Sequence, residues 1–193
     1  MSTALRKTMT LDEFLAWEER QDSRYEFDGF EPVAMTGGSY AHDTIAMNLA
    51  AALIPRLRGT SCRAHGRDFK LLVAGKARSP DAFVSCRSYG NADTVARDPV
   101  VIFEVLSPST AATDRLDKLR EYTALPSVRR YVMLEQDRIA ATVLERDGER
   151  WLIAVLITGD AVLHMPEIGV EVPLAELYDG VTFEPPPAGG DGG

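Results

Sequence analysis

The chain has 193 residues, of which 45% are hydrophobic and 26% are charged, and this length predicts one globular domain over residues 1–184. Its formal net charge of -8 repels phosphate backbones, which weighs against indiscriminate nucleic-acid binding. No run approaches the roughly 20 apolar residues of a membrane span, and MSTALRKTMT lacks the apolar core of a signal peptide, so we expect a cytoplasmic protein without a membrane partner.

The first third of the chain predicts a helix, a hairpin and a longer helix. Residues 11–20 have the spacing of a short amphipathic helix, and residues 24–35 alternate around Asp28-Gly29, which suits a tight turn. After a glycine pair, apolar side chains and His42 share one face of a predicted helix over residues 41–57. The fold therefore opens as α, β-hairpin, α.

Strand-like runs and one further helix fill the rest of the chain. The helix, residues 114–125, follows the cap-rich segment SPSTAATD and ends before Pro126. Three strands are expected before this helix and three after it, with weaker ones near Val162 and Val170. The six stronger runs are residues 67–74, 81–86, 100–106, 130–134, 139–145 and 151–157. The tail PPPAGGDGG, residues 185–193, cannot bury apolar surface, so we expect it to be disordered.

The chain contains two cysteines, Cys62 and Cys86. They are isolated from each other and from the three histidines, so the pattern indicates neither a zinc cluster nor a disulfide scaffold. We therefore expect two ordinary buried thiols in a reducing compartment.

One basic run interrupts this otherwise acidic chain. It consists of Arg56, Arg58, Arg63, Arg67 and Lys70. Such a segment can supply local contacts to DNA phosphates although the net charge disfavours them. A solvated helix end and loop is the alternative interpretation.

A single carboxylate interrupts the apolar segment PVVIFEVLS, residues 99–107. A run of this kind is typical of a central strand. Alternation places Glu104 on the same face as Ile102 and Leu106, where an unpaired charge is costly. Glu104 therefore needs a metal, a cation or a proton, and a buried pair with an arginine is the structural alternative.

Asp81 follows a proline at the head of the predicted strand 81–86. Two carboxylates that enter from neighbouring strands form a divalent-metal site, because Mg²⁺ takes oxygen ligands and commonly one or two carboxylates. Asp81 and Glu104 are therefore the candidate metal ligands. A Pro-Asp pair by itself is also a frequent turn signal.

Lys118 is the third candidate, because it lies on the inward face of the predicted helix, between Tyr122 and Leu125. A lysine beside two carboxylates can orient or activate a water and balance phosphate charge. The alternatives are a lysine at the margin of the core and an ion pair with Asp114, four residues earlier.

Two further polar side chains can reach a shared cleft. His42 lies on the apolar face of the first long helix, and Glu26 alternates with Tyr25 and Phe27 on the hairpin. A core histidine and a solvated hairpin face are the respective alternatives.

Taken together, YEFDG, AHDTIAMNLAAAL, SPDAFV and PVVIFEVLSPSTAATDRLDKLREYTALPSVRRYVMLE resemble the Uma-two family of restriction-endonuclease-like proteins. The resemblance covers roughly residues 8–156. It implies the PD-(D/E)XK nuclease fold, an α/β (α+β) domain in which helices flank a mixed β-sheet, and Mg²⁺-dependent cleavage of phosphodiester bonds.

The resemblance also implies which residues form the active site. They are Asp81, Glu104 and Lys118, with His42 and Glu26 at accessory positions. The superfamily's commoner pattern has a lysine two residues after the second acid, where this chain has Leu106. The resemblance therefore requires a lysine displaced onto the following helix.

Our leading hypothesis is a DNA endonuclease in which Asp81 and Glu104 hold Mg²⁺, or alternatively Mn²⁺. Lys118 then positions the water or the scissile phosphate, and His42 is a candidate proton shuttle or phosphate contact. The competing hypothesis is a catalytically inactive protein of the same fold that acts as a binding or regulatory module. Many nucleases of this fold cut as dimers, so the resemblance also implies a homodimer.

Overall fold

The computed structural model describes residues 8–107 and 112–183, with side chains described from residue 115 in the second range. The helices are α1 (Leu11–Glu18), α2 (Tyr40–Arg56), α3 (Ala112–Ala124) and α4 (Leu174–Leu177), with the 3-10 helix η1 (Pro166–Ile168). The strands are β1 (Tyr25–Phe27), β2 (Pro32–Ala34), β3 (Arg63–Gly66), β4 (Lys70–Val73), β5 (Lys76–Arg78), β6 (Ala82–Ser85), β7 (Val95–Ala96), β8 (Val101–Leu106), β9 (Arg130–Glu135), β10 (Ala141–Asp147), β11 (Arg150–Leu156), β12 (Val162–Met165) and β13 (Val170–Pro173). No helix in the described ranges is long and apolar enough to cross a membrane.

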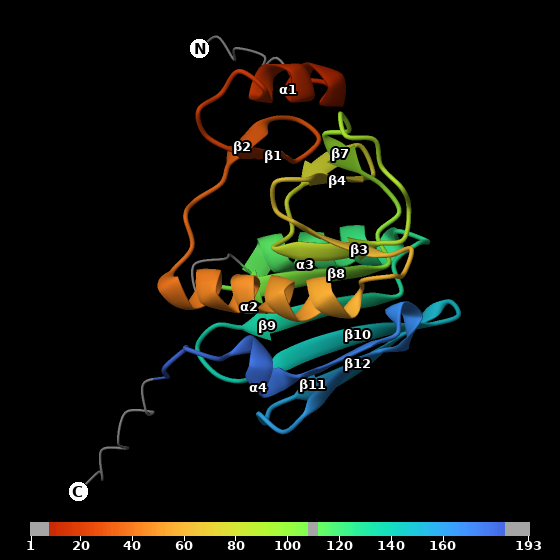
Figure 1. Ribbon diagram of the computed structural model, residues 1–193. Helices are drawn as coiled ribbons and strands as arrows, with labels where there is room; N and C mark the ends of the chain where they lie inside the picture. Colours follow the sequence, from red (N-terminus) through yellow and green to blue (C-terminus); the bar gives the residue numbers. More distant parts are fainter. Residues whose placement is uncertain (1–7, 108–111, 184–193) are drawn as a thin grey trace, which may run out of the picture.

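A six-stranded mixed sheet forms the centre of the molecule, in the order β11-β10-β9-β8-β6-β3. β8 and β9 are parallel, and the other neighbours are antiparallel. Figure 1 shows α2 in front of this sheet and α3 behind it, with the smaller sheet β2-β1-β5-β4-β7 above. The prediction of a mixed sheet flanked by helices is confirmed.

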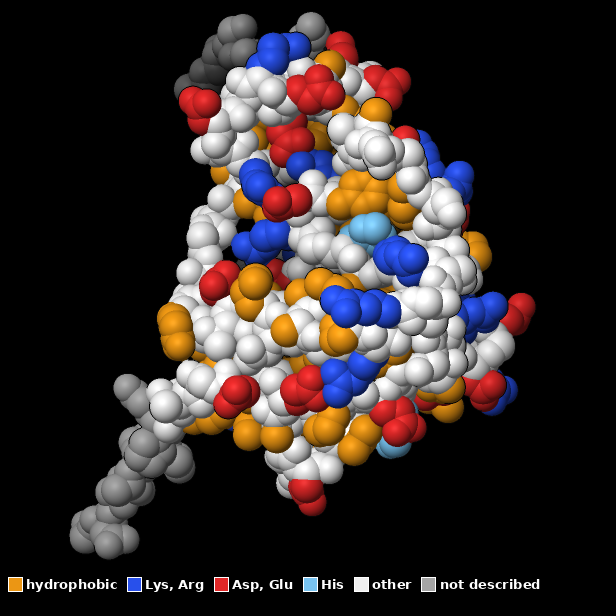
Figure 2. Space-filling view, in the orientation of Figure 1, with side chains coloured by type: hydrophobic (Ala, Val, Ile, Leu, Met, Phe, Trp, Pro, Cys, Tyr) orange, Lys and Arg blue, Asp and Glu red, His pale blue; other side chains and the backbone are white. Residues whose placement is uncertain are grey.

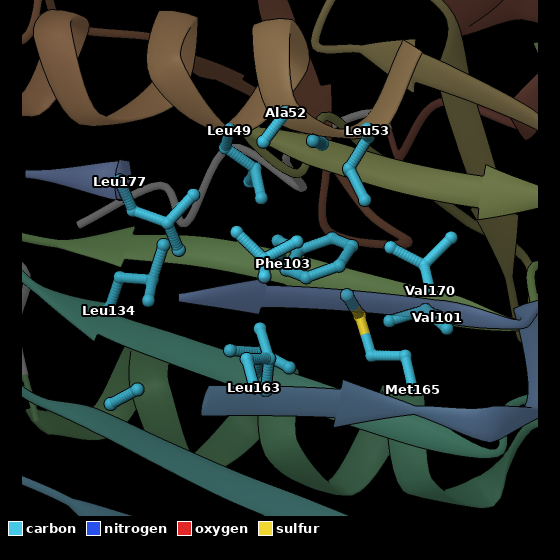
Figure 3. Packing of buried hydrophobic residues seen from close by; sticks show 14 of the residues in the cluster. Leu49, Ala52, Leu53, Val101, Phe103, Leu134, Leu163, Met165, Val170 and Leu177 are labelled. Atoms are coloured by element: carbon cyan, nitrogen blue, oxygen red, sulfur yellow. The ribbon is translucent and has the colours of Figure 1, made fainter. Parts of the chain in front are cut away.

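The two faces of the central sheet pack against different partners because successive side chains of a strand alternate between faces. On one face, Phe103 of β8 packs against Leu49 and Leu53 of α2, and strands β12 and β13 complete this core (Figure 3). On the other face, Ile102 packs in a second cluster with Tyr122 of α3. The alternation predicted for β8 is therefore what separates the two cores.

The N-terminal helix holds the β1–β2 hairpin in place. A capping box begins α1, because the Thr10 hydroxyl accepts from the Glu13 N–H at 3.2 Å and the Glu13 carboxylate accepts from the Thr10 N–H at 2.8 Å. Phe14 is fully buried and stacks on Phe27 of β1, with ring centroids 5.0 Å apart. This contact fixes the hairpin residue Glu26 one position away.

Several short elements were not predicted. The expectation of three strands between the long helices is wrong, since the structure has six from β3 to β8. The missed strands β3, β5 and β7 have two to four residues, and α4 has four, which is too short for a periodic pattern. Residues 108–111 of the expected capping segment, the side chain of Asp114 and the tail at residues 185–193 lie outside what the structure describes.

The expectation of two free thiols is also wrong, because a disulfide joins Cys62 to Cys86. The antiparallel register of β3 and β6 pairs Arg63 with Ser85. The residue before Arg63 and the residue after Ser85, which are Cys62 and Cys86, therefore lie directly opposite each other. The cysteines are 24 residues apart in sequence, and only the strand pairing brings them together.

Candidate active site

A cleft of about 470 Å³ opens at the carboxyl ends of the parallel strands β8 and β9. The segment from β2 to the start of α2 borders it on one side and α3 on the other. Figure 2 shows acidic and basic side chains gathered in a hollow beside this segment. All five predicted site residues line the cleft: Glu26, His42, Asp81, Glu104 and Lys118.

Strand register brings the two predicted metal ligands onto one face. β6 and β8 are antiparallel and pair Ala82 with Phe103, so Asp81 and Glu104 are the next opposed residues. Side chains at opposed positions of an antiparallel pair lie on the same face, with Cβ atoms about 4.5–5.5 Å apart. Both carboxylates therefore enter the cleft from neighbouring strands.

Asp81 is buried and accepts from three donors. Its Oδ2 receives the Val105 backbone N–H at 2.7 Å and lies 3.2 Å from His42 Nε2, while Oδ1 receives Arg67 at 2.6 Å. Burial alone raises the pKa of this carboxyl, but the hydrogen bond and charge of His42, the Val105 N–H and the charge of Arg67 together hold the pKa below its ordinary value. Asp81 is therefore an ionised carboxylate surrounded by hydrogen-bond donors.

Glu104 is equally buried, but its contacts are longer. Lys118 Nζ lies 3.3 and 3.5 Å from its two carboxylate oxygens, and the Tyr122 hydroxyl donates at 3.0 Å. Burial raises the pKa of Glu104 to about 7; Lys118 opposes this rise, whereas the negative charges of Asp81 and Glu26 add to it. The structure contradicts the alternative of a buried pair between Glu104 and an arginine, because the cation beside Glu104 is Lys118.

Glu26 lies inside the protein, so its interpretation as part of a solvated hairpin face is wrong: it is 8% exposed. Its carboxylate accepts from the Ser79 N–H at 3.0 Å and from Arg78 at 3.1 Å. Lys118 Nζ lies 3.7 Å away. Glu26 therefore helps to hold the lysine that also faces Glu104.

The start of α2 delivers His42 to the cleft. Ser39 is the N-cap, and its hydroxyl accepts from the His42 N–H at 3.2 Å. Gly38 leaves room for the imidazole, since a Cβ at that position would lie 2.9 Å from His42 Nδ1. Although buried as a core histidine would be, His42 points its Nε2 at Asp81.

The five residues of the predicted basic run separate in the structure. Arg56 pairs with Glu176, Arg67 with Asp81 and Lys70 with Glu18. Arg58 and Arg63 remain exposed. The run is therefore not one continuous phosphate-binding strip, and its main contribution to the cleft is Arg67.

The sequence did not single out three residues that the structure brings to the site: Tyr122, Arg78 and Arg115. The helical spacing places Tyr122 in the apolar stripe of its helix and does not indicate that its hydroxyl donates to Glu104. Arg78 is buried between Glu26 and Glu121. Arg115 lines the cleft. No local pattern distinguishes such residues, because their partners come from other elements.

The donor set suits a hard cation bound by few protein ligands. Within residues 8–107 and 115–183, no group of three or more His, Cys, Asp or Glu side chains is arranged to hold a metal ion. Two carboxylates suffice for Mg²⁺, which keeps several waters and shares substrate phosphate oxygens. Asp81 has one acceptor position left after its three donors. The lysine contact of Glu104 is 3.3 Å long, so a metal ion would not have to displace a short ion pair there. The residues therefore fit a two-carboxylate site.

Comparisons with known proteins agree with this architecture. The profile of the Uma2 family, described as "Putative restriction endonuclease", matches residues 11–175. An uncharacterized protein of Synechocystis sp. is 30% identical over 177 residues, covering 89% of this chain and 92% of that protein, and a second is 26% identical over 170 residues, covering 85% and 96%.

A solved structure has the same fold. It is described as a "putative nuclease belonging to DUF820" from Anabaena variabilis, and it superimposes with a TM-score of 0.72. The likeness covers 88% of this chain and 97% of that one, at 16% sequence identity. At this identity the likeness establishes the fold alone.

Proposed function

Because this chain belongs to the Uma2 family, we propose that it is an endonuclease that hydrolyses phosphodiester bonds in DNA with Mg²⁺, or Mn²⁺, as its cofactor. The observation that carries the proposal is the opposed pair Asp81 and Glu104 in one cleft, with Lys118 beside them. Two carboxylates and a lysine provide the charges that phosphoryl transfer requires.

Each residue has a defined task in this proposal. Asp81 and Glu104 hold the ion, which when bound supplies Lewis acidity toward the phosphate and lowers the pKa of a coordinated water. Lys118 positions the attacking water or the scissile phosphate, and Glu26 keeps the lysine in place from 3.7 Å. His42 holds or moves a proton at Nε2, which lies against Asp81.

A Mg²⁺ titration with supercoiled, linear and single-stranded DNA tests the activity. The wild type is expected to cut at least one of these substrates in a metal-dependent way, and Glu104→Gln to lose metal binding and cleavage together. Trace contamination is controlled by purifying both proteins in parallel. Equal cutting by wild type and Glu104→Gln would contradict the nuclease assignment.

A binding or regulatory module of the same fold is the competing function, and the net charge of -8 favours it. In that case the wild type binds nucleic acid or a protein partner without Mg²⁺-dependent cleavage, and Glu104→Gln leaves the affinity unchanged. The same titration, read as binding, separates the two functions.

We also propose that the protein forms a homodimer through the edge strand β11. Ile153 and Val155 of this edge strand are 68% and 60% exposed. An exposed apolar edge strand tends to pair with a strand of another chain. Two copies paired antiparallel about Ala154 would place Ile153 of each copy opposite Val155 of the other, so that these apolar side chains would contact each other across the interface.

Sedimentation of the wild type and of Val155→Lys tests this assembly. The wild type is expected to sediment as a dimer and the lysine variant as a monomer with an unchanged melting temperature. Exposed Val33 lies on β2, outside this strand, so Val33→Lys is the matched control and should leave the dimer intact. A monomeric wild type would contradict the proposal.

A further inference from the structure

Three cationic side chains line the cleft, and two of them are matched by carboxylates. Arg67 lies 2.6 Å from Asp81, and Lys118 lies 3.3 Å from Glu104 and 3.7 Å from Glu26. The third cation, Arg115 of α3, has no carboxylate within 4 Å among the side chains that the structure describes. Among the described side chains, its charge is therefore the one in the cleft that has no ion pair.

The hydrogen bonds of Arg115 are also incomplete. One terminal nitrogen donates to the Ser107 backbone carbonyl at 3.2 Å, which orients the guanidinium beside the end of β8. Its Nε is buried and has no hydrogen-bond partner in the described part of the chain. A guanidinium has five N–H donors, so most of its capacity remains for a ligand. The buried Nε cannot reach a ligand, so the open donors are the N–H groups of the two terminal nitrogens, beside the cleft that Arg115 lines.

The place of Arg115 on α3 relates it to the proposed reaction site. Residues three apart on a helix share a face, so Arg115 and Lys118 both face the cleft. Three residues correspond to a rise of about 4.5 Å along the helix. Arg115 therefore lies one turn from the lysine that contacts Glu104, toward the helix N-terminus.

We infer that Arg115 forms a phosphate subsite that binds the backbone phosphate next to the scissile one. The planar guanidinium binds two phosphate oxygens at once, while the Ser107 carbonyl holds it in register. A nucleic-acid strand seated this way lies with one phosphate at Arg115 and the next beside Lys118 and the two carboxylates. This inference rests on the proposed function for the identity of its ligand, but the subsite itself requires only a phosphate.

The test compares wild type, Arg115→Met and Arg115→Lys on two probes in EDTA, so that cleavage does not intervene. The probes are a fluorescein-labelled 20-base-pair DNA duplex, followed by anisotropy, and inorganic phosphate, followed by the melting temperature. The matched control is Arg120→Met, because Arg120 is on the same helix with its side chain 77% exposed. Circular dichroism checks that every variant is folded.

Arg115→Met is expected to weaken DNA binding about tenfold, lower the salt dependence by about one phosphate contact, and abolish stabilisation by phosphate. Arg115→Lys should restore part of the affinity, because a lysine keeps the charge but loses the two-pronged geometry. Arg120→Met should match the wild type on both probes.

The outcomes separate this inference from the proposed function. If the wild type fails to bind DNA but phosphate stabilises it only when Arg115 is present, the subsite holds and the DNA assignment fails. If Arg115→Met and the wild type respond equally to both probes, or if the wild type binds neither, the subsite is overturned.

Discussion

Two buried clusters of charge lie on opposite faces of the central sheet, and they are compensated very differently. At the start of β9, Arg130 binds Glu167 at 2.7 and 3.2 Å and Glu145 at 3.1 Å. Near the end of β8, the described partners of Glu104 are a lysine at 3.3 Å and one hydroxyl at 3.0 Å. Arg130 shares the face of Val132, whereas Glu104 faces α3.

The difference shows how a structural ion cluster is distinguished from a candidate reaction site. Burial disfavours the charge of Arg130, but the hydrogen bonds and charges of Glu167 and Glu145 raise its pKa above the ordinary value. For Glu104, burial prevails, so its pKa rises to about 7 and its ionised form is incompletely compensated. The charge of the Arg130 cluster is compensated by its two glutamates, whereas the Glu104 cluster is suited to an additional cation.

The largest effect is expected from Lys118→Met, which keeps the size of the side chain and removes its charge. Cleavage should slow by about 10²- to 10³-fold while metal binding persists, because the lysine acts on water or phosphate rather than on the ion. Single-turnover rates and a Mn²⁺ binding isotherm measure the two quantities. Loss of metal affinity in parallel with the rate would show that the lysine only shapes the carboxylate site.

Arg130→Ala should break the other cluster without touching the cleft. The unfolding free energy is expected to fall by about 3 kcal/mol, at the low end for a broken buried pair, since Glu145 is half exposed and can be solvated. Urea unfolding gives this value, and the cleavage rate per folded molecule should stay unchanged. A loss under about 1 kcal/mol would mean that the Arg130 cluster contributes little to stability.

Added metal should stabilise the protein through the Glu104 cluster alone. At a Mg²⁺ concentration 100 times its dissociation constant, linkage predicts about 2.7 kcal/mol of added stability. Melting in EDTA and in Mg²⁺ measures it for wild type, Glu104→Gln and Asp81→Ala. Both substitutions should remove the stabilisation, and its survival in either one would place the ion elsewhere.

The smallest effect is expected from Arg67→Gln. Arg67 occupies Oδ1 of Asp81 at 2.6 Å, so it competes with a cation for the same oxygen. Removing the guanidinium should tighten Mn²⁺ binding by a few-fold, about 1 kcal/mol, as for one partly exposed ion pair. A calorimetric titration checks this, and Arg87→Gln, which disrupts an exposed pair with Asp98 outside the cleft, is the control.

The sequence by itself determined the features that follow from the regular spacing of residues within one helix or one strand. The 3.6-residue spacing of α2 and the two-residue alternation of β8 depend only on local geometry, so they predicted both elements and the burial of Glu104. The resemblance to Uma-two proteins supplied the family and the mixed sheet, which the comparisons confirm. The roles of the five predicted site residues and the extent of the domain remain predictions.

Only the tertiary structure decided which distant residues meet. The register of β6 against β8 opposes Asp81 to Glu104, and the register of β3 against β6 joins Cys62 to Cys86. A shift of one residue in either pairing would send these side chains to opposite faces, yet no short-range pattern in the chain specifies it. Contacts of this kind depend on how whole strands pack, and that is also why the incompletely bonded Arg115 could not be found from its own neighbours in sequence.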